Sequence, residues 1–474
     1  MSELQGRAVA PAVAALGPQR YRVTLLLMLA YTLNSADRQL IAIIGQPIKL
    51  DLQLSDTQFG FLVGTAFASL YTFSGIPVAR LAERFNRVNI LCTMMILWSG
   101  LTALCGAALR FPQLLGLRMA VGVAEAGCTP PAHSIISDYF LPRERATALS
   151  IYSCGISLGY ILSAMLGGYL ALHYGWRVAC VALGLPGLLI AVVVKLVVRE
   201  PARPRLREQP ALSTELQQLG VVCRALLLRR PLAHFFVGVT VAAFASQGSW
   251  AFIPAFFNRV FDLNYATVGI VAALTGGVAV GAGLVSGGPL ADRLARYSVR
   301  WYAYICAAGL AISTPLFVLA FIQRHWISTA ALLGLASFFQ YLSFGPTFGV
   351  IQNAVEPRQR ATATALIYVV LNVVALGGGA LFTGWLIDRF AEIDFQSAAV
   401  HAASFRAQCP GGQARGSQPE LTRWLCRATL ARASREGIIV TVLLYAWAAL
   451  HYFLAARGLE EELDASPAGR QPAR

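Results

Sequence analysis

The chain has 474 residues, of which 57% are hydrophobic and only 13% are charged. Soluble domains carry about 25% charged residues, so this chain lacks the polar surface that a water-soluble protein of its length needs. The net charge of +15 would suggest a nucleic-acid partner in a soluble protein, but the basic residues cluster in short segments between apolar runs. The composition therefore predicts an integral membrane protein that binds no nucleic acid.

Apolar runs long enough to cross a bilayer follow one another along the whole chain, and hairpin-length connections leave no room for a soluble domain. We predict an all-α membrane protein of about twelve transmembrane helices: an N-terminal bundle over 1–198, a cytoplasmic linker over 199–231 and a C-terminal bundle over 232–474. The runs lie at about 21–46, 57–79, 89–109, 112–135, 147–172, 177–198, 232–257, 265–290, 301–322, 326–352, 361–387 and 437–456.

Arginines occupy the connections after the even-numbered runs. Because basic residues are retained on the cytoplasmic side, we expect both termini to be cytoplasmic. Among the 38 basic residues only Lys49 and Lys195 are lysines. We interpret this preference for arginine as the mark of a GC-rich bacterial genome, and we expect the protein to lie in the bacterial inner membrane. In the linker, apolar residues from Leu212 to Leu226 have helical spacing, which predicts an amphipathic helix on the inner membrane face.

The long connection 390–435 is expected on the outer side, although it is rich in arginine. Its apolar positions from Leu421 to Leu430 predict a basic amphipathic helix resting on the outer surface. Cys409 and Cys426 lie in this connection, at a separation that permits a disulfide without requiring one.

The first run contains the acid and base pair Asp37 and Arg38, with Asn34 on the same general face. Adjacent residues on a helix lie about 100° apart, so the two charges cannot neutralise each other well and need partners on other helices. Arg118 and Glu125 in the fourth run are seven residues apart and share a helix face, so they can supply those partners. The alternative is a pair that sits at a helix end and extends to the membrane interface.

Two sequence motifs occur once in each half of the chain. PRERATA at 142–148 returns as PRQRATA at 357–363, and ARLAERFNR at 79–87 corresponds to GPLADRLAR at 288–296. At these residues the chain resembles the major facilitator superfamily of secondary transporters, which implies two six-helix pseudo-repeats and alternating access. The resemblance implies a cytoplasmic ion-pair gate, and a cluster that only sets topology is the alternative. The gate residues are Glu83, Arg84, Arg87, Arg145, Asp292, Arg293, Arg296 and Arg360.

NSADR in the first run and RMAVGVAEAG followed by TPPAHSIISDYF in the fourth resemble the spinster-like branch of this superfamily. The resemblance implies export of lysolipids or sphingolipid-like molecules, with Asp37 and Glu125 in proton coupling and Asn34, Arg38 and Arg118 as charge or substrate partners. The second half lacks counterparts to these charges. Its interior polar residues are candidate substrate contacts, namely Gln247, Gln340, Tyr341 and Asn372.

The sequence contains no nucleotide-binding loop and no cluster with metal-ligand spacing, so we expect no ATP-driven transport, no cofactor and no metal. No nucleophile and base pair stands at reactive spacing, so we expect no enzyme activity. We predict a monomeric, proton-coupled secondary transporter of an amphipathic, lipid-like substrate, surrounded by membrane lipids. A transporter of small organic anions is the alternative within transport. An alternative of another class is a transport-dead receptor or lipid scrambling protein on the same scaffold.

Overall fold

The computed structural model describes residues 19–141, 144–201, 220, 223–224, 227–354, 360–398, 404–414 and 418–464. Every regular element in these ranges is a helix, which confirms the all-α prediction. The predicted helix Leu212–Leu226 of the linker lies largely outside the described residues.

Ten helical stretches in the described ranges are long and apolar enough to cross a membrane, and they correspond to ten of the twelve predicted runs. The other two runs are helical as well. The run 21–46 is largely α2 (Gln19–Ile43), which carries Asp37 and Arg38, and the run 112–135 divides into α7 (Phe111–Glu125) and α8 (Thr129–Tyr139). The protein is therefore a multi-pass helical membrane protein.

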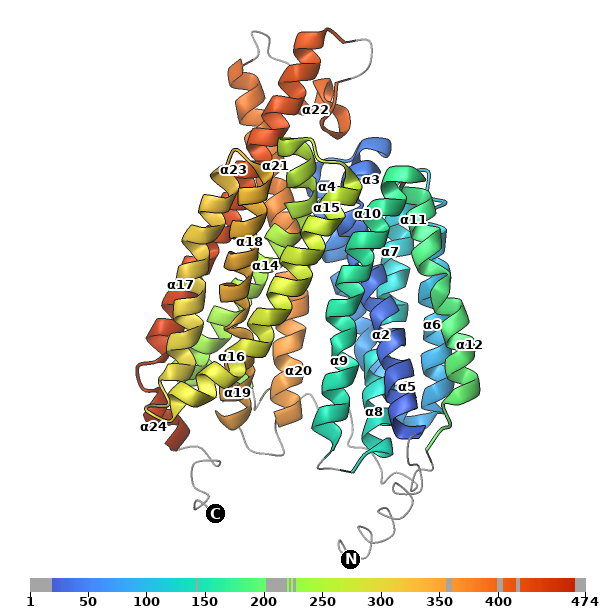
Figure 1. Ribbon diagram of the computed structural model, residues 1–474, viewed down its shortest axis with the longest axis vertical. Coiled ribbons are helices and arrows are strands. Elements are labelled where there is room, and N and C mark those ends of the chain that lie inside the picture. The colour runs from blue at the N-terminus through green and yellow to red at the C-terminus, as the bar shows by residue number, and fades with distance from the viewer. Residues whose placement is uncertain are drawn as a thin grey trace, which may run out of the picture. The chain divides into compact units, whose positions relative to one another are not determined.

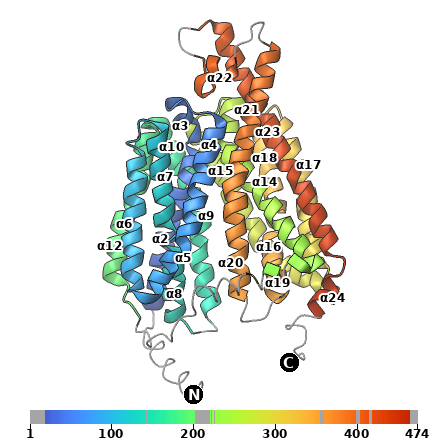
Figure 2. The same ribbon diagram turned by 180° about the vertical axis from the view of Figure 1, so that it is seen from behind.

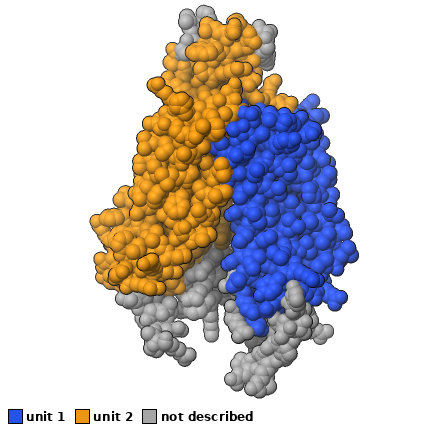
Figure 3. Space-filling view, in the orientation of Figure 1, with its two compact units in different colours: residues 1–48, 66–206, 264–273 blue, residues 49–65, 207–263, 274–474 orange. Residues whose placement is uncertain are grey.

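Packing divides the chain into two compact units, coloured separately in Figure 3. Unit 1 comprises residues 1–48, 66–206 and 264–273, and unit 2 comprises 49–65, 207–263 and 274–474. Unlike the predicted bundles, each unit thus contains a short segment from the other half of the sequence.

Unit 1 is built mainly from the helices of the first half. α2 lies along α9, and α6 packs against α7, α11 and α12 (Figures 1 and 2). Trp98 of α6 is fully buried and belongs to an apolar core that joins α2, α6, α7, α8, α9 and α12. Besides α2, α7 and α8, unit 1 contains α5 (Thr65–Arg84), α6 (Arg87–Cys105), α9 (Arg145–Leu162), η1 (Ser163–Gly167), α10 (Gly168–His173), α11 (Gly175–Gly184), α12 (Pro186–Val197) and α15 (Tyr265–Ala272).

Unit 2 is organised around α14 and α23, which pack along each other. α21 packs against both of them, and α17 packs against α23. The elements of this unit are α4 (Asp56–Val63), α14 (Arg230–Phe261), η2 (Ala273–Ala279), α16 (Val280–Ala295), α17 (Trp301–Ile322), α18 (Trp326–Tyr341), α19 (Phe344–Ala354), α20 (Arg360–Val370), η3 (Leu371–Leu376), α21 (Gly377–Ala398), α22 (Phe405–Gln408), η4 (Pro410–Gly412), α23 (Glu420–Ala455) and α24 (Leu459–Asp464). The short helix α3 (Gly45–Asp51) is divided between the units, with residues 49–51 in unit 2.

Glycines explain why α4 belongs to unit 2. A Cβ atom at Gly60 would lie 2.2 Å from the carbonyl oxygen of Ala380 in α21, and one at Gly384 would lie 2.2 Å from that of Asp56. Side chains at these positions would therefore push the two helices apart.

The same device holds α15 in unit 1. A Cβ atom at Gly168 of α10 would lie 2.4 Å from the carbonyl oxygen of Tyr265, and one at Gly269 would lie 2.1 Å from that of Ala164. α4 and α15 begin corresponding runs of the two halves, the second and the eighth. The repeat thus extends to α4 and α15, which we call the exchanged segments because each belongs to the unit formed mainly by the other half of the sequence. Glycines allow the close packing of both segments.

The segment 421–430 does not form a separate surface helix. It is the beginning of α23, a single helix of 36 residues that is about 54 Å long at about 1.5 Å per residue. Leu421 and Trp424 are exposed, but Cys426 and Leu430 are buried within unit 2. The segment therefore continues the last span and is held to unit 2 by its buried residues Cys426 and Leu430.

Replacing Gly384 by alanine should separate α4 from α21 and lower the thermal unfolding midpoint, because overpacking costs about 1–3 kcal/mol. Gly349→Ala is the matched control, since no atom lies within 4 Å of a Cβ atom built there. Thermal unfolding of the purified protein in detergent measures the difference. Equal midpoints for the two variants would contradict the close approach.

Candidate functional site

Four charged side chains gather inside unit 1, on α2 and α7. Asp37, Arg118 and Glu125 are each at most 1% exposed, while the side chain of Arg38 is 26% exposed. Two acids and two bases make the group formally neutral. The structure thus brings together all four charges predicted for the first half, and we call them the charged cluster.

Arg38 and Glu125 form the central ion pair of this cluster. The Arg38 Nε donates to Glu125 Oε2 at 3.0 Å, and one terminal nitrogen of Arg118 donates to the backbone carbonyl of Arg38 at 3.5 Å. Glu125 Oε1 has no hydrogen-bond partner among the described residues. A buried carboxylate oxygen without a donor costs free energy. Glu125 Oε1 is therefore an acceptor that can take a proton or a donor group of a ligand.

Two aromatic rings of α5 cover the guanidinium groups. The Arg38 Cζ lies 4.6 Å from the centroid of the Tyr71 ring and 5.3 Å from that of Phe67, and the Arg118 Cζ lies 5.2 Å from the latter. Gly122 makes room for this helix, because a Cβ atom there would lie 2.9 Å from the Phe67 carbonyl oxygen. Cation–π contacts of this kind contribute about 0.5–2 kcal/mol each and help to hold both guanidinium groups in place.

Asp37 and Asn34 remain buried next to this ion pair. Asp37 Oδ1 and both polar side-chain atoms of Asn34 have no hydrogen-bond partner among the described residues. The charged groups that act on Asp37 are Glu125 and Arg118. A rotation of either side chain would therefore change the charge balance at Asp37 directly.

In unit 2 the four predicted polar residues line one pocket of about 200 Å³. Its wall includes the π-helical turn η3, which contributes Asn372, together with Gln247 of α14 and Gln340 and Tyr341 of α18. The Tyr341 hydroxyl lies 3.3 Å from Ser246 Oγ, and Gln340 Oε1 has no partner among the described residues. We call this the polar pocket.

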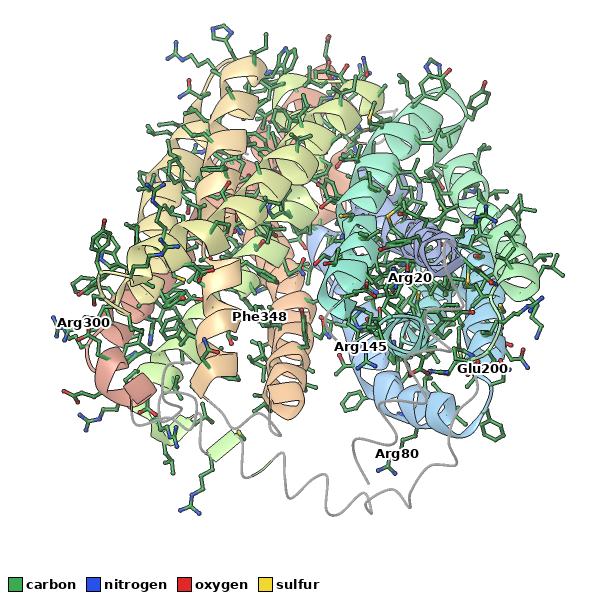
Figure 4. All side chains as sticks on the ribbon, turned by 60° about the horizontal axis from the view of Figure 1, so that its bottom comes forward. Arg20, Arg80, Arg145, Glu200, Arg300 and Phe348 are labelled. Carbon is green, nitrogen blue, oxygen red and sulfur yellow. A yellow bond between two sulfur atoms is a disulfide. The ribbon has the colours of Figure 1, made fainter. Side chains whose placement is uncertain are left out.

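The predicted gate residues occupy different environments. Arg87 is fully buried and donates to Asp138 at 2.5 Å and Glu200 at 2.6 Å, while Arg145 donates to the Phe140 carbonyl. Figure 4 shows Arg145 and Glu200 at the same end of unit 1. In unit 2 Asp292 is exposed and accepts from Tyr302, and Arg293 and Arg296 are exposed. The side chains of Glu83, Arg84 and Arg360 lie outside the described part of the chain.

The structure joins Cys409 to Cys426 by a disulfide, which attaches the turn after α22 to the start of α23. In the described ranges no group of three or more metal-ligand side chains occurs.

An ion network in unit 2 was missed by the sequence analysis. Asp56 accepts from Lys49 at 2.6 Å and from Arg259 at 2.6 Å, and Arg259 also donates to Ser434. Burial and the neighbouring Arg259 lower the pKa of Lys49 to about 8. In the sequence, these charged residues lie close to the ends of apolar runs. Charged residues that only set the membrane topology are found at the same positions, so the sequence did not distinguish the two roles.

The family model of the Major Facilitator Superfamily matches residues 27–379. The chain belongs to the major facilitator superfamily. It is 34% identical over 380 residues to an MFS-type efflux pump of Mycolicibacterium smegmatis (79% of this chain, 86% of the relative) and 29% identical over 405 residues to protein spinster homolog 1 of Xenopus tropicalis (79% and 74%).

Solved structures confirm the resemblance to the spinster-like branch of the superfamily. A bacterial homologue of the human lysosomal transporter spinster, crystallised in an inward-facing and unoccupied conformation, matches with a TM-score of 0.85 and 30% identity. The match covers 95% of this chain and 100% of that chain. The protein is thus a transporter of this superfamily with a spinster-like structure.

The ion pair can be tested by a double-mutant cycle. Arg38→Gln leaves Glu125 buried without its cation and should lower the thermal midpoint markedly, because removing one partner of a buried pair costs about 3–5 kcal/mol. Adding Glu125→Gln should recover much of that loss, since the uncompensated charge disappears. Strictly additive shifts in the four proteins would show that the two side chains do not interact.

Proposed function

We propose that this protein is a proton-coupled secondary transporter of an amphipathic, lipid-like substrate, such as a lysolipid. The observation that carries the proposal is the buried charged cluster, in which two carboxylic acids and two arginines share one low-dielectric site. Ionisable groups inside membrane helices commonly serve substrate or proton pathways.

Proton exchange follows from the contacts of the two acids. Glu125 holds Arg38 through only one of its oxygens, and Asp37 has an oxygen without a partner among the described residues. When substrate or helix movement takes an arginine away, burial favours the protonated acid. When the arginine returns, the carboxylate form is favoured and the proton leaves.

The chemistry of the two units supports an amphipathic substrate. Unit 1 has charges that suit an ionic head group, and Arg38 among them is partly exposed. Unit 2 has a polar pocket lined by amide and hydroxyl groups among apolar residues such as Leu371 and Ala375. A mixture of apolar surface and a few oriented polar groups is typical of small-molecule sites. We expect the protein to work as a monomer in the inner membrane of a bacterium.

Small organic anions are a second candidate substrate class. The hexuronate transporter of Bacillus subtilis is 24% identical over 377 residues (77% of this chain, 88% of the relative), and two guanidinium groups suit carboxylates well. Thermal stabilisation separates the classes, because a ligand at about 100 times its Kd adds about 2.7 kcal/mol. Stabilisation by lysophosphatidylethanolamine but not by glucuronate would support the lipid-like substrate, and the reverse result the organic anion.

Neutralising either acid should abolish transport driven by a pH gradient. Asp37→Asn and Glu125→Gln should each stop accumulation of the stabilising ligand in proteoliposomes while binding is at least partly retained, because neither amide can release a proton. Asp262→Asn is the matched control: Asp262 is exposed in the turn after α14 with a φ of 53°, which asparagine also tolerates. If accumulation in the Asp37 and Glu125 double variant still follows the pH gradient, this proton site is excluded.

The proposed orientation places the Cys409–Cys426 disulfide outside the cytoplasm. Both cysteines are buried, so we expect a membrane-impermeant thiol reagent to label intact spheroplasts through them only after reduction has released the turn of α22 and η4 from α23. The Cys409→Ser and Cys426→Ser double variant controls for the exposed Cys154. Labelling only after the membrane is opened would reverse the topology.

A further inference from the structure

Unit 2 contains a second and larger cavity, of about 560 Å³, at the end where α4 begins. It shares no lining residue with the polar pocket, and none of the charged cluster lines it. Three parts of unit 2 surround it: the start of α4, the last part of α21, and the turn formed by α22 and η4. In Figures 1 and 2 α22 lies beside the end of α21. We call it the end cavity.

Two features hold the walls of the end cavity in place. Asp388 of α21 accepts from the backbone nitrogens of Asp56 and Thr57 at 2.9 and 2.8 Å and from Thr57 Oγ1 at 2.6 Å, so it caps α4. The Cys409–Cys426 disulfide attaches the turn of α22 and η4 to α23. Hydrogen bonds and a disulfide therefore fix the elements that form the walls of the cavity.

Other charges of the lining already have partners. Asp388 is engaged by α4, Lys49 donates to Asp56 at 2.6 Å, and Glu392 accepts from Gln396 at 2.8 Å. Their charges and hydrogen-bonding groups are thus partly satisfied within unit 2.

Arg389 and Arg406 line the same cavity, and no hydrogen bond or ion pair joins either guanidinium to another described residue. Apolar surface lies with them, since Trp385 is 51% exposed and Phe405 also lines the cavity. A guanidinium is planar and always charged, so it suits a carboxylate or phosphate, and aromatic rings suit an apolar chain or ring.

We infer that the end cavity binds an amphipathic organic anion, with its carboxylate or phosphate on Arg389 and Arg406 and its apolar part against Trp385 and Phe405. This site is separate from the proposed transport site and does not depend on what is transported. Because α4, α21 and the turn of α22 and η4 each supply a wall, an occupant contacts all three and stabilises unit 2.

Calorimetric titration of the full chain in phosphatidylcholine nanodiscs tests the site. The probes are 4-phenylbutyrate, its neutral analogue 4-phenylbutanol, and dodecyl phosphate as a lipid-like anion. We expect an anion to bind at least about tenfold more tightly than the alcohol, and Arg389→Gln with Arg406→Gln to weaken it at least about tenfold. Binding of 4-phenylbutyrate indicates a free organic anion as ligand, and binding of dodecyl phosphate alone indicates a lipid head group.

Matched variants locate the binding. Trp385→Ala should weaken binding, whereas Trp424→Ala should not, because Trp424 is also exposed but does not line the cavity. Arg423→Gln controls for loss of an exposed positive charge from the same unit. The inference is overturned if the double arginine variant, folded with an unchanged thermal midpoint, binds like the wild type. It is also overturned if no anion binds, if the alcohol binds equally, or if Gln340→Ala in the polar pocket removes the binding.

Discussion

Charged side chains in an apolar bundle must find partners inside the protein, because the bilayer supplies neither water nor counterions. This constraint accounts for the polar architecture of unit 1. Arg38 is neutralised by Glu125 and covered by two rings of α5, and Arg118 packs against one of the same rings. The four side chains interact electrostatically, so a change at one member alters the environment of the others. The proposal of proton exchange rests on this coupling.

The second constraint is the close approach of helix backbones. In a membrane, helices gain little from the hydrophobic effect and associate through packing, so small residues decide where they meet. Gly60 and Gly384 seat α4 in unit 2, and Gly168 and Gly269 seat α15 in unit 1. Both segments begin spans that continue in the other unit. Sequence repetition in PRERATA and PRQRATA thus has a structural counterpart in this pair of exchanged segments.

Length and hydropathy predict spans well, because each span must satisfy its backbone hydrogen bonds internally and cover a fixed thickness. Helical periodicity also placed Arg118 and Glu125 on one face. It could not find Tyr71 or Asp388 as partners, because their contacts with Arg38 and with the start of α4 join helices far apart in the sequence. The segment 421–430 was interpreted as a surface helix because amphipathicity alone does not say what covers the apolar face. Here unit 2 covers Cys426 and Leu430, while Leu421 and Trp424 are exposed.

The two kinds of buried ion pair differ in how completely they are satisfied. In unit 2, Asp56 accepts from two cations, one on each oxygen, and its helix is capped by Asp388, so little remains for a ligand or proton to change. In unit 1, Glu125 uses one oxygen for Arg38, and the other has no partner among the described residues. Saturated networks rigidify a structure, whereas an incompletely satisfied network responds to a new charge. This difference explains why one network is assigned a structural role and the other a role in coupling, although both are buried ion pairs of carboxylates with basic side chains.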